Sequence, residues 1–290
     1  MCVVCVLCAF AILKSRDIGG GLFAEATGRT KAPGFLATPL ALNLWQNKDF
    51  ILAWSLFIAF LGISVGVIAP NIADQMNEML AAFASWGPAM AKLGNQEGLV
   101  AISIYMLGLM GGGSILAISL MQGLRRDESA GYTEMMLAKP ISRERYMRSF
   151  IGMVFLYTAA VLAALGLSTG IGWSAVTGDS AFILKTLGMA LTKIPSLWLI
   201  VGFAAFLYGV APKLQTVLSS LLVGGLIVLE MFWEVGLLPW EVLAPTPFGI
   251  AHYSVPIGEL RVFPLIIALI VAVGLAWLGV VGFKKRNIGV

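Results

Sequence analysis

Long uninterrupted apolar stretches dominate the hydrophobic pattern of this chain. Six of them approach or exceed the length of about 20 residues that crosses a bilayer as an α-helix. The pattern therefore predicts an all-α, polytopic membrane protein with spans at residues 50–69, 99–121, 150–173, 195–211, 216–238 and 262–283. The apolar core of the fourth span is short, and we expect this helix to begin earlier, around Leu187.

Two connections between the spans have weaker apolar patterns. In residues 70–98, apolar residues recur every three or four positions and polar residues lie between them. This spacing predicts an amphipathic helix on the membrane surface, ending near Pro88. Residues 239–262 contain too many prolines for a span but are apolar enough for short re-entrant or interfacial pieces.

The first 49 residues do not contain a complete span. Met1–Leu13 is apolar but too short to cross a bilayer, so we interpret residues 1–20 as the remnant of a preceding transmembrane helix. Residues 21–49 form a linker on the cytoplasmic side, in which Pro39–Lys48 is either a helix at the membrane surface or an ordinary connection. Residues 50–290 then form a six-span domain.

A short repeat supports this division of the chain. Residues 12–20 read ILKSRDIGG and residues 282–290 read GFKKRNIGV, and both follow an apolar run. The simplest interpretation is that the first copy ends one six-span half and the second copy ends the next. The chain would then be a C-terminal half preceded by the end of another.

The composition excludes an ordinary soluble domain. Hydrophobic residues make up 59% of the 290 residues and charged residues only 12%, against about 25% charged in soluble proteins. All three cysteines lie within the first eight residues, spaced by three. No fourth cysteine accompanies them, so we expect neither an iron–sulfur cluster nor any other metal site.

The distribution of Lys and Arg predicts the orientation. Alternating the sides of six spans places fifteen of the 19 basic residues on one side, in the N-terminal linker, the connection at 122–149, the turn at Lys213 and the C-terminus. The positive-inside rule assigns that side to the cytoplasm. We therefore expect a multi-pass plasma-membrane protein whose C-terminus and 122–149 loop are cytoplasmic.

The stretch Arg125–Arg148 stands out within this pattern. Ten of its 24 residues are charged, whereas residues 98–124 and 149–178 carry no charge at all. Arg125–Ala138 is predicted to form a short helix that stops at Lys139-Pro140, with Ser142 capping the next span. Six basic residues suit a plain solvated loop, but the four acids are not needed for orientation and favour a surface that a soluble partner binds.

The same stretch resembles the signature E-x-x-G-x-x-E-x-L-L-A-x-P-x-S-R of type-2 ABC exporter permeases. The resemblance is nearest to the exporters of polyketide antibiotics, which have two six-span halves on one chain. It covers residues 12–290 and includes the Arg16–Leu22, Lys213 and Pro245–Phe248 regions. Met136 departs from the family's leucine, and the matching positions are Glu128, Gly131, Glu134, Leu137, Ala138, Pro140, Ser142 and Arg143.

The resemblance implies a permease energised by a separate ABC ATPase, with the loop acting as a coupling helix. The chain contains no G-x-x-x-x-G-K-[ST] motif, which agrees with an ATPase supplied in trans. A second permease half, from a homodimer or from a separate first half, and membrane lipid are the other expected partners; no cofactor or nucleic acid is expected. The candidate coupling residues are Arg125, Glu128, Gly131, Glu134, Pro140, Ser142 and Arg143.

Features within the spans are less specific. Glu230 in the fifth span is either a substrate or proton contact in the transport pathway, or a residue near the outer membrane boundary. His252 has no apparent partner in the sequence, and we expect it to be no ligand. Glycines of three spans are predicted to allow close helix contact, namely Gly108, Gly111–Gly113, Gly224, Gly225 and Gly274.

Three classes of function fit a protein of this kind. The first, which we favour, is the permease of an ATP-driven exporter of a hydrophobic or amphipathic compound such as an antibiotic. The second is an intramembrane enzyme, which the lack of intramembrane His and Asp disfavours. The third is a non-transporting membrane subunit, a sensor or immunity protein built on the same scaffold.

Overall fold

The computed structural model describes residues 34–82, 96–254 and 261–287. The chain divides into two compact units, residues 1–37 and 38–290. In the first unit the described part is the 3₁₀ helix η1 (Gly34–Ala37). The apolar Met1–Leu13 segment, the repeat at 12–20 and the expected helix end near Pro88 lie outside the described residues.

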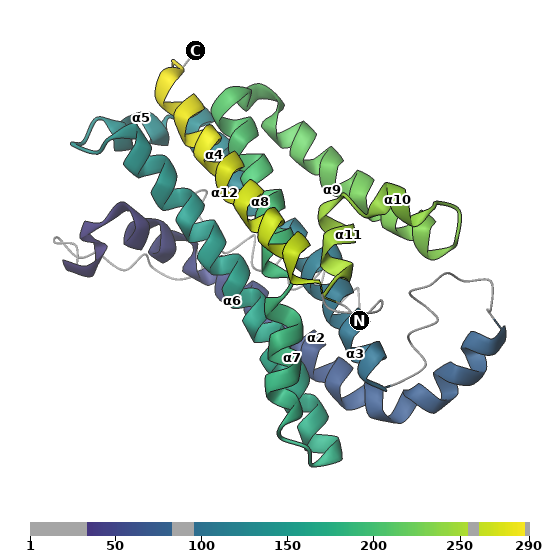
Figure 1. Ribbon diagram of the computed structural model, residues 1–290. Helices are drawn as coiled ribbons and strands as arrows, with labels where there is room; N and C mark the ends of the chain where they lie inside the picture. Colours follow the sequence, from purple (N-terminus) through teal and green to yellow (C-terminus); the bar gives the residue numbers. More distant parts are fainter. Residues whose placement is uncertain (1–33, 83–95, 255–260, 288–290) are drawn as a thin grey trace, which may run out of the picture. The chain divides into compact units, whose positions relative to one another are not determined.

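The second unit consists of α-helices joined by short connections (Figure 1). Its described residues contain no strand. In chain order the helices are α2 (Pro39–Ala82), α3 (Gln96–Tyr105), the π-helix η3 (Met106–Gly111), α4 (Gly112–Ser129), α5 (Tyr132–Leu137), α6 (Arg143–Thr177), α7 (Phe182–Leu191), α8 (Ile194–Val210), α9 (Pro212–Glu234), α10 (Trp240–Leu243), α11 (Pro247–His252) and α12 (Val262–Lys285).

Six helical stretches in the described residues are long and apolar enough to cross a membrane, which confirms the predicted fold class. The second stretch joins α3, η3 and α4. The fourth joins α7 and α8 across a turn at Thr192–Lys193, so that this span does begin before Leu187. The proline-rich connection after α9 contains only the short helices α10 and α11 among its described residues, as its sequence predicts.

Helix α2 is longer than one bilayer crossing requires. Its 44 residues correspond to about 66 Å at 1.5 Å per residue. The predicted boundary at Phe50 is not a break, because Pro39–Lys48 forms the first turns of the same helix. Those turns are fixed to α6, where the side chain of Asn43 donates to the Ser149 hydroxyl at 3.2 Å. Pro70 lies inside the helix, and Figure 1 shows that the C-terminal part of α2 changes direction, as expected where a proline interrupts a helix.

The fifth span ends four residues before its predicted end. Gly236 takes a φ of 76°, and its N–H donates to the Trp233 carbonyl while the Leu237 N–H donates to the Phe232 carbonyl. These two bonds are those of a Schellman motif, which stops a helix at a glycine. The apolar residues at 235–238 therefore belong to the turn. Helix α9 also begins earlier than predicted, because Pro212 suits its first turn and places Lys213 inside the helix.

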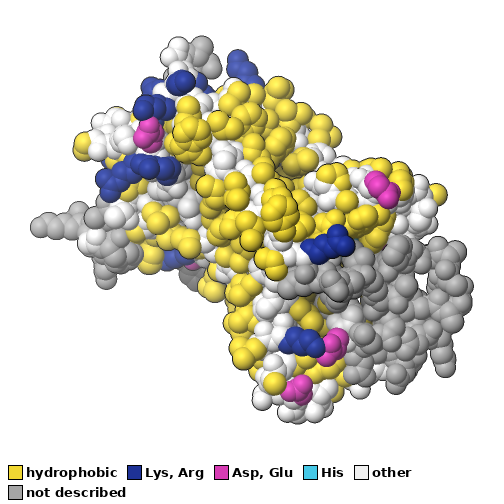
Figure 2. Space-filling view, viewed as in Figure 1, with side chains coloured by type: hydrophobic (Ala, Val, Ile, Leu, Met, Phe, Trp, Pro, Cys, Tyr) yellow, Lys and Arg dark blue, Asp and Glu magenta, His cyan; other side chains and the backbone are white. Residues whose placement is uncertain are grey.

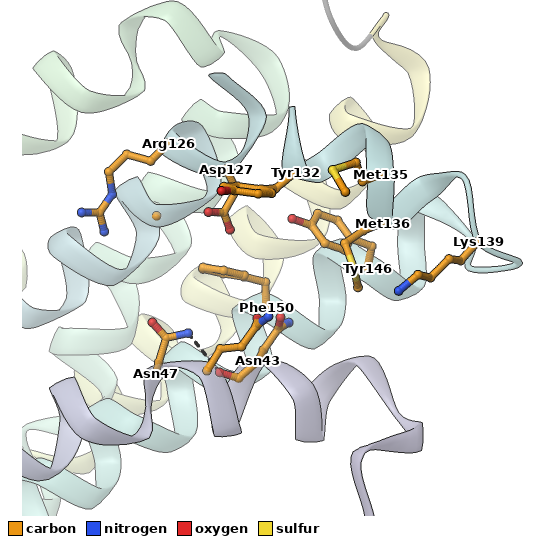
Figure 3. Close-up of a pocket in the computed structure, with 12 residues that line it drawn as sticks. Asn43, Asn47, Arg126, Asp127, Tyr132, Met135, Met136, Lys139, Tyr146 and Phe150 are labelled. Carbon is orange, nitrogen blue, oxygen red and sulfur yellow. Dashed lines mark hydrogen bonds between the residues drawn. The ribbon is translucent and has the colours of Figure 1, made fainter. Parts of the chain in front are cut away.

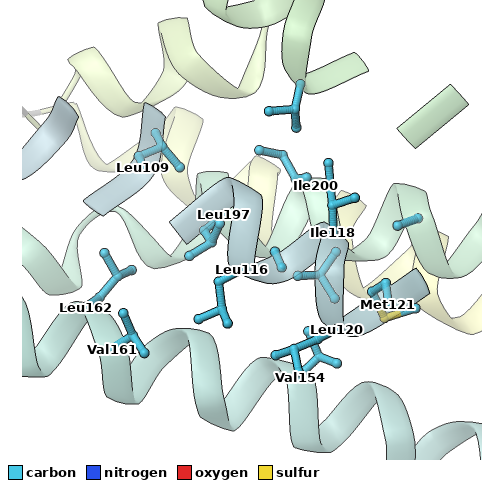
Figure 4. Packing of buried hydrophobic residues seen from close by; sticks show 14 of the residues in the cluster. Leu109, Leu116, Ile118, Leu120, Met121, Val154, Val161, Leu162, Leu197 and Ile200 are labelled. Carbon is cyan, nitrogen blue, oxygen red and sulfur yellow. The ribbon is translucent and has the colours of Figure 1, made fainter. Parts of the chain in front are cut away.

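Helix α4 lies in the centre of the bundle, packed against α6, α8 and α9. Figure 4 shows its apolar side chains between those of α6 and α8, including Leu116 of α4, Leu162 of α6 and Leu197 of α8. The preceding π-helix η3 ends at Gly111, in the glycine triplet that the sequence suggests as a bend. There the Ser114 hydroxyl donates to the Leu109 carbonyl at 2.5 Å, outside the regular α-helical pattern.

Close helix contacts in this structure depend on glycine, but only in part on the glycines that the sequence suggested. At the crossing of α8 and α12, a Cβ atom on Gly209 would lie 2.0 Å from the Gly279 carbonyl oxygen. The prediction is wrong for Gly224, Gly225 and Gly274, which have nothing from the described part of the chain within 4 Å of such an atom. It holds for Gly108 and Gly112, whose neighbours on other helices lie closer than 3.0 Å, and for Gly113, which has Leu197 of α8 at 3.1 Å. The contact of Gly111 is with Met106 of its own π-helix.

The surface of this unit matches a protein surrounded by lipid. Large apolar side chains are exposed along α2, α9 and α12, and Figure 2 shows a broad hydrophobic surface over the spans. In the same view most Lys and Arg side chains gather near α5 and the C-terminal end of α12 (Figures 1 and 2). The charged loop after the second span thus lies at the end of the helices where basic residues concentrate.

Candidate functional site

The charged loop does not contain the single helix that the sequence predicts over Arg125–Ala138. Helix α4 continues to Ser129, and the separate helix α5 begins at Tyr132. Between them Gly131 takes a φ of 77°, a left-handed conformation that stops α4 and that residues with a Cβ atom adopt only at a cost. The expected coupling helix is therefore two helices with a glycine between them.

The second half of the loop follows the prediction more closely. Helix α5 ends at Leu137, and the exposed Lys139 and Pro140 lead to the start of α6. Ser142 is extended (φ −68°, ψ 147°) and its hydroxyl accepts from the backbone N–H of Arg145 at 3.3 Å. This bond confirms Ser142 as the N-cap of the third span.

Glu128 is occupied by a contact that the sequence did not suggest. Its carboxylate accepts two hydrogen bonds from the guanidinium of Arg286, at 2.9 and 2.6 Å. The side chains are 6% and 14% exposed, and Arg125 lies 3.9 Å from the same carboxylate. We call this pair the Glu128–Arg286 clamp, since it joins the end of α4 to the end of α12.

Arg143 strengthens the same connection from the start of α6. Its guanidinium donates to the backbone carbonyl of Arg286 at 2.8 Å, and the neighbouring Glu144 forms an ion pair with Lys284 at 2.7 Å. The Arg286 guanidinium also lies over the Tyr208 ring of α8, 4.7 Å from its centre. Three spans, α4, α6 and α12, therefore meet at one group of charged residues.

The remaining loop residues form an exposed face on α5. Tyr132 and Met135 are 59% and 66% exposed, and Glu134 is also exposed. On the opposite face, Thr133 is buried with its hydroxyl 3.4 Å from that of Tyr146. Of the seven candidate coupling residues, Glu128 and Arg143 hold the helices together, Gly131 and Ser142 shape the loop, and Glu134 and Pro140 reach the surface with Arg125 partly exposed.

A cavity of about 440 Å³ lies beside α5 (Figure 3). The first turns of α2 contribute Asn43 and Asn47 to its wall, and α6 contributes Phe150. Figure 3 shows these groups facing the cavity, with Arg126 and Asp127 on the α4 side. Beside the cavity, the inner side of α5 is held by the buried Thr133 and by Met136 and Leu137, which pack against the core.

Glu230 lies at the opposite end of α9 from this loop, and it is paired. Its Oε1 atom lies 2.5 Å from Nε2 of His252, the last residue of α11. The two side chains are 0% and 3% exposed. The sequence offers no apparent Cys or Asp partner for His252, but the connection through α10 folds back and brings the histidine to a glutamate of α9.

Aromatic and polar groups enclose this pair. The rings of Tyr105, Trp233 and Trp240 lie 4.6, 4.9 and 5.8 Å from the imidazole. Lys193, in the turn between α7 and α8, is buried and donates to the Ala251 carbonyl at 3.3 Å and to the Ser254 hydroxyl at 2.7 Å. An acid, an imidazole and an amine thus lie in one apolar region, a costly arrangement inside a membrane protein.

Comparison with known proteins shows the family of this chain. Residues 36–284 match the family described as "Multidrug efflux system permease Rv1217c, C-terminal domain". The chain belongs to this family. It is also similar to the multidrug efflux system permease protein Rv1217c of Mycobacterium tuberculosis (strain ATCC 25618 / H37Rv), with 26% identity over 291 residues, covering 98% of this chain and 52% of that protein. The chain spans about half the length of the relative it matches.

The family places this chain among permease C-terminal halves, as the loop signature had suggested. The described residues hold no cluster of three or more His, Cys, Asp or Glu side chains that could bind a metal ion. The two sites described above, the loop with its clamp and the Glu230–His252 pair, lie at opposite ends of the permease C-terminal half.

Sequence reasoning missed the partner at both ends. Arg286 looked like one of three basic residues that follow a last span, and nothing nearby marks it as a partner of Glu128, 158 residues earlier. For His252 a weak signal existed, because the proline-broken connection predicts a chain that folds back on the bundle. The prolines indicate that the chain returns to the bundle, but they do not indicate which residue His252 contacts there.

Proposed function

We propose that this chain is one permease half of an ATP-driven exporter in the plasma membrane. Its cargo is a hydrophobic or amphipathic compound such as an antibiotic, and a separate ABC ATPase supplies the energy. The family membership and the multidrug efflux relative support a transport role. The protein itself would be the transmembrane permease and have no nucleotide site of its own.

The observation that carries this proposal is the way α5 is presented. It projects between α4 and α6 with Tyr132, Glu134 and Met135 exposed, although two of these three side chains are largely apolar. A short helix with exposed apolar residues in a charged loop is typical of a surface that a partner covers. We propose that the ATPase binds this face.

The charged contacts behind α5 explain how force from the ATPase would reach the membrane. Movement of α5 passes directly to α4 and α6, its neighbours in the chain. The Glu128–Arg286 clamp and the Arg143 bonds add α12 to the same group. Because hydrogen-bonded ion pairs of low exposure resist separation, we propose that the three spans move as one body.

The proposal also includes orientation and a second half. Lys and Arg concentrate around α5 and the end of α12, and under the positive-inside rule this supports a cytoplasmic loop and C-terminus. The relative is about twice as long as the matched region. We therefore propose that this half works beside a second six-span half, either a second copy or a different sequence.

Reconstitution with the cognate ATPase tests the function. We expect the complex in proteoliposomes to hydrolyse ATP faster when an amphipathic drug is added and to move that drug across the bilayer. Met135→Asp should abolish both ATPase binding and transport, because it places a charge on the apolar face of α5. Leu237→Asp is the matched control, since Leu237 is also exposed but lies in the turn after α9.

Each outcome separates the candidate functions. An ATPase that binds without any drug movement would instead support a non-transporting sensor or immunity subunit. Equal binding by the native protein and Met135→Asp would contradict α5 as the docking surface.

A further inference from the structure

The Glu230–His252 pair belongs to neither the ATPase surface nor the glycine contacts. It joins the penultimate turn of α9 to the last residue of α11. Both members are ionisable, and both are almost completely removed from the surface. An ionisable residue inside a membrane span is a strong indication of function, and proton relays are built from such Glu and His side chains.

Proton counting shows why this pair is sensitive to its surroundings. One proton lies between Nε2 of the imidazole and the carboxylate, and the other imidazole nitrogen carries its own proton. In this state the net charge of the pair is zero. Adding one more proton makes the net charge positive, and removing the proton between the two groups makes it negative. Either charge is costly in a site without water, so a change in proton number favours exposure of the pair.

The site has an atom ready to accept that additional proton. Oε2 of Glu230 is buried without a hydrogen-bond partner among the described residues, and so is the Tyr105 hydroxyl, which lies close to the same carboxylate. Buried polar atoms are rarely left unpaired in native structures. A proton from entering water can bind Oε2, where the competing donor is the nearby Tyr105 hydroxyl.

The other ionisable groups around the pair determine the sign of its response. Tyr105 of α3 and Glu234 of α9 face Glu230, and Lys193 reaches α11 from the turn between α7 and α8. Glu241 of α10 and Arg261, which precedes α12, are exposed. When charged, Lys193 opposes a second proton while the pair stays buried, so uptake of that proton requires water to enter.

Separation of the pair would have a defined structural effect. The C-terminal end of α11 is held by the Glu230–His252 bond, by the two bonds from Lys193 and by the Arg261 N–H, which donates to the Tyr253 carbonyl at 3.1 Å. Neutralising Glu230 leaves the His252 imidazolium without its counter-ion in an apolar region. Hydration of this cation would displace α11 from α9.

We propose that Glu230 and His252 form a proton-binding site whose occupancy controls the attachment of α11 to α9. The proton comes from water on the side opposite the Arg125–Arg148 loop and binds to Oε2 of Glu230, and no covalent bond breaks elsewhere. Acid on that side therefore opens this end of the permease half. The inference does not depend on ATPase binding at α5.

Cysteine accessibility measures this opening directly. Ala251→Cys, at a fully buried position of α11, is placed in a chain whose Cys2, Cys5 and Cys8 are replaced by Ser, and is labelled with a membrane-impermeant maleimide. The labelling rate of Ala251→Cys is divided by that of Leu237→Cys, a variant at an exposed position in the α9–α10 turn. This division removes the intrinsic pH dependence of the thiol. Protein in sealed vesicles is titrated over about pH 6.5 to 3.5, the range in which an exposed glutamate beside a protonated histidine gains its proton.

We expect the normalised rate to rise on acidification by up to about tenfold per pH unit, the limit for one proton. Glu230→Gln and His252→Gln should each remove this dependence, because neither leaves an acid–imidazole pair. Glu234→Gln, one turn away on the same helix, should keep it. An unchanged pH dependence in Glu230→Gln, or no dependence with the native pair, would overturn the proposal.

A second measurement needs no substitution at Ala251. The His252 ring lies 4.9 Å from Trp233, so its protonation or displacement should change tryptophan emission. We expect a pH-dependent emission change that is absent in both Trp233→Phe and His252→Gln. Persistence of the full change in both variants would contradict the site even if the cysteine variant fails to fold.

Discussion

The guanidinium of Arg286 donates two hydrogen bonds to the carboxylate of Glu128, at 2.9 and 2.6 Å, across 158 residues of sequence. This relationship changes the role of a residue that the loop signature had grouped with a docking surface. Glu128 lies inside the protein, facing the end of the last span, and not toward a soluble partner. The signature thus combines residues that hold helices together with residues that reach the surface.

Removal of Arg286 should destabilise the protein. Arg286→Ala leaves the Glu128 carboxylate, which is 6% exposed, without its main partner. Breaking a buried ion pair in this way lowers the free energy of unfolding by about 3 kcal/mol or more. We expect a lower thermal unfolding midpoint in detergent. Glu144→Gln is the control, since its Lys284 partner is largely exposed and exposed pairs add little. Partial recovery in the Glu128→Arg/Arg286→Glu exchange would show that the pairing itself matters.

Two glutamates of the same loop should respond differently to charge reversal. Glu128→Lys places a second cation beside Arg286 and should lower the unfolding midpoint. Glu134→Lys changes only an exposed residue and should leave the midpoint unchanged while weakening binding of the ATPase. Unfolding and pull-down assays on the two variants check this, and a loss of stability in both would contradict separate roles.

The six spans could be predicted because each is a long apolar run. The ends of the helices were harder to predict from the sequence. Gly236 stops α9 through a backbone conformation, whereas the apolar residues around it continue the hydrophobic pattern. Apolar character alone places residues 235–238 in the membrane span, and only the glycine before Pro239 indicates otherwise.

The sites could be predicted only where they are local in sequence. Ser142 caps the helix that begins at the next residue by accepting from the N–H of Arg145, three residues on, so its role follows from spacing. Glu230 and His252 are 22 residues apart across a turn and two short helices, and no periodicity joins them. The glycines show the same limit, because Gly209 and Gly224 look alike in sequence and only the packed helices distinguish them.

The glycine contacts give a direct test of the packing. Gly209→Val would place a Cβ atom 2.0 Å from the Gly279 carbonyl oxygen, so α8 and α12 must separate. Overpacking of this kind costs about 1–3 kcal/mol or more, and we expect a lower unfolding midpoint. Gly224→Val should be neutral, because nothing lies within 4 Å of that position. If Gly209→Val and Gly224→Val lower the unfolding midpoint equally, Gly224 must be covered by a second permease half.

Gly131 should be required for its backbone conformation and not for its size. It takes a φ of 77°, and a Cβ atom at this position would have nothing within 4 Å. Gly131→Ala therefore meets no neighbour but costs about 1–2 kcal/mol in the left-handed region. The alanine variant relieves this cost by extending α4 toward α5, which turns the exposed face of α5 away from its partner. ATPase binding, measured by pull-down, should therefore fall more than stability does.

Two further variants separate the backbone conformation of Gly131 from other effects of substitution. Gly131→Asn should retain most of the ATPase binding, since asparagine tolerates the left-handed conformation. Gly188→Ala, at an open position within α7, should slightly raise the unfolding midpoint, as alanine does in a helix. If Gly131→Ala and Gly131→Asn bind the ATPase equally well, the orientation of α5 does not depend on this φ angle.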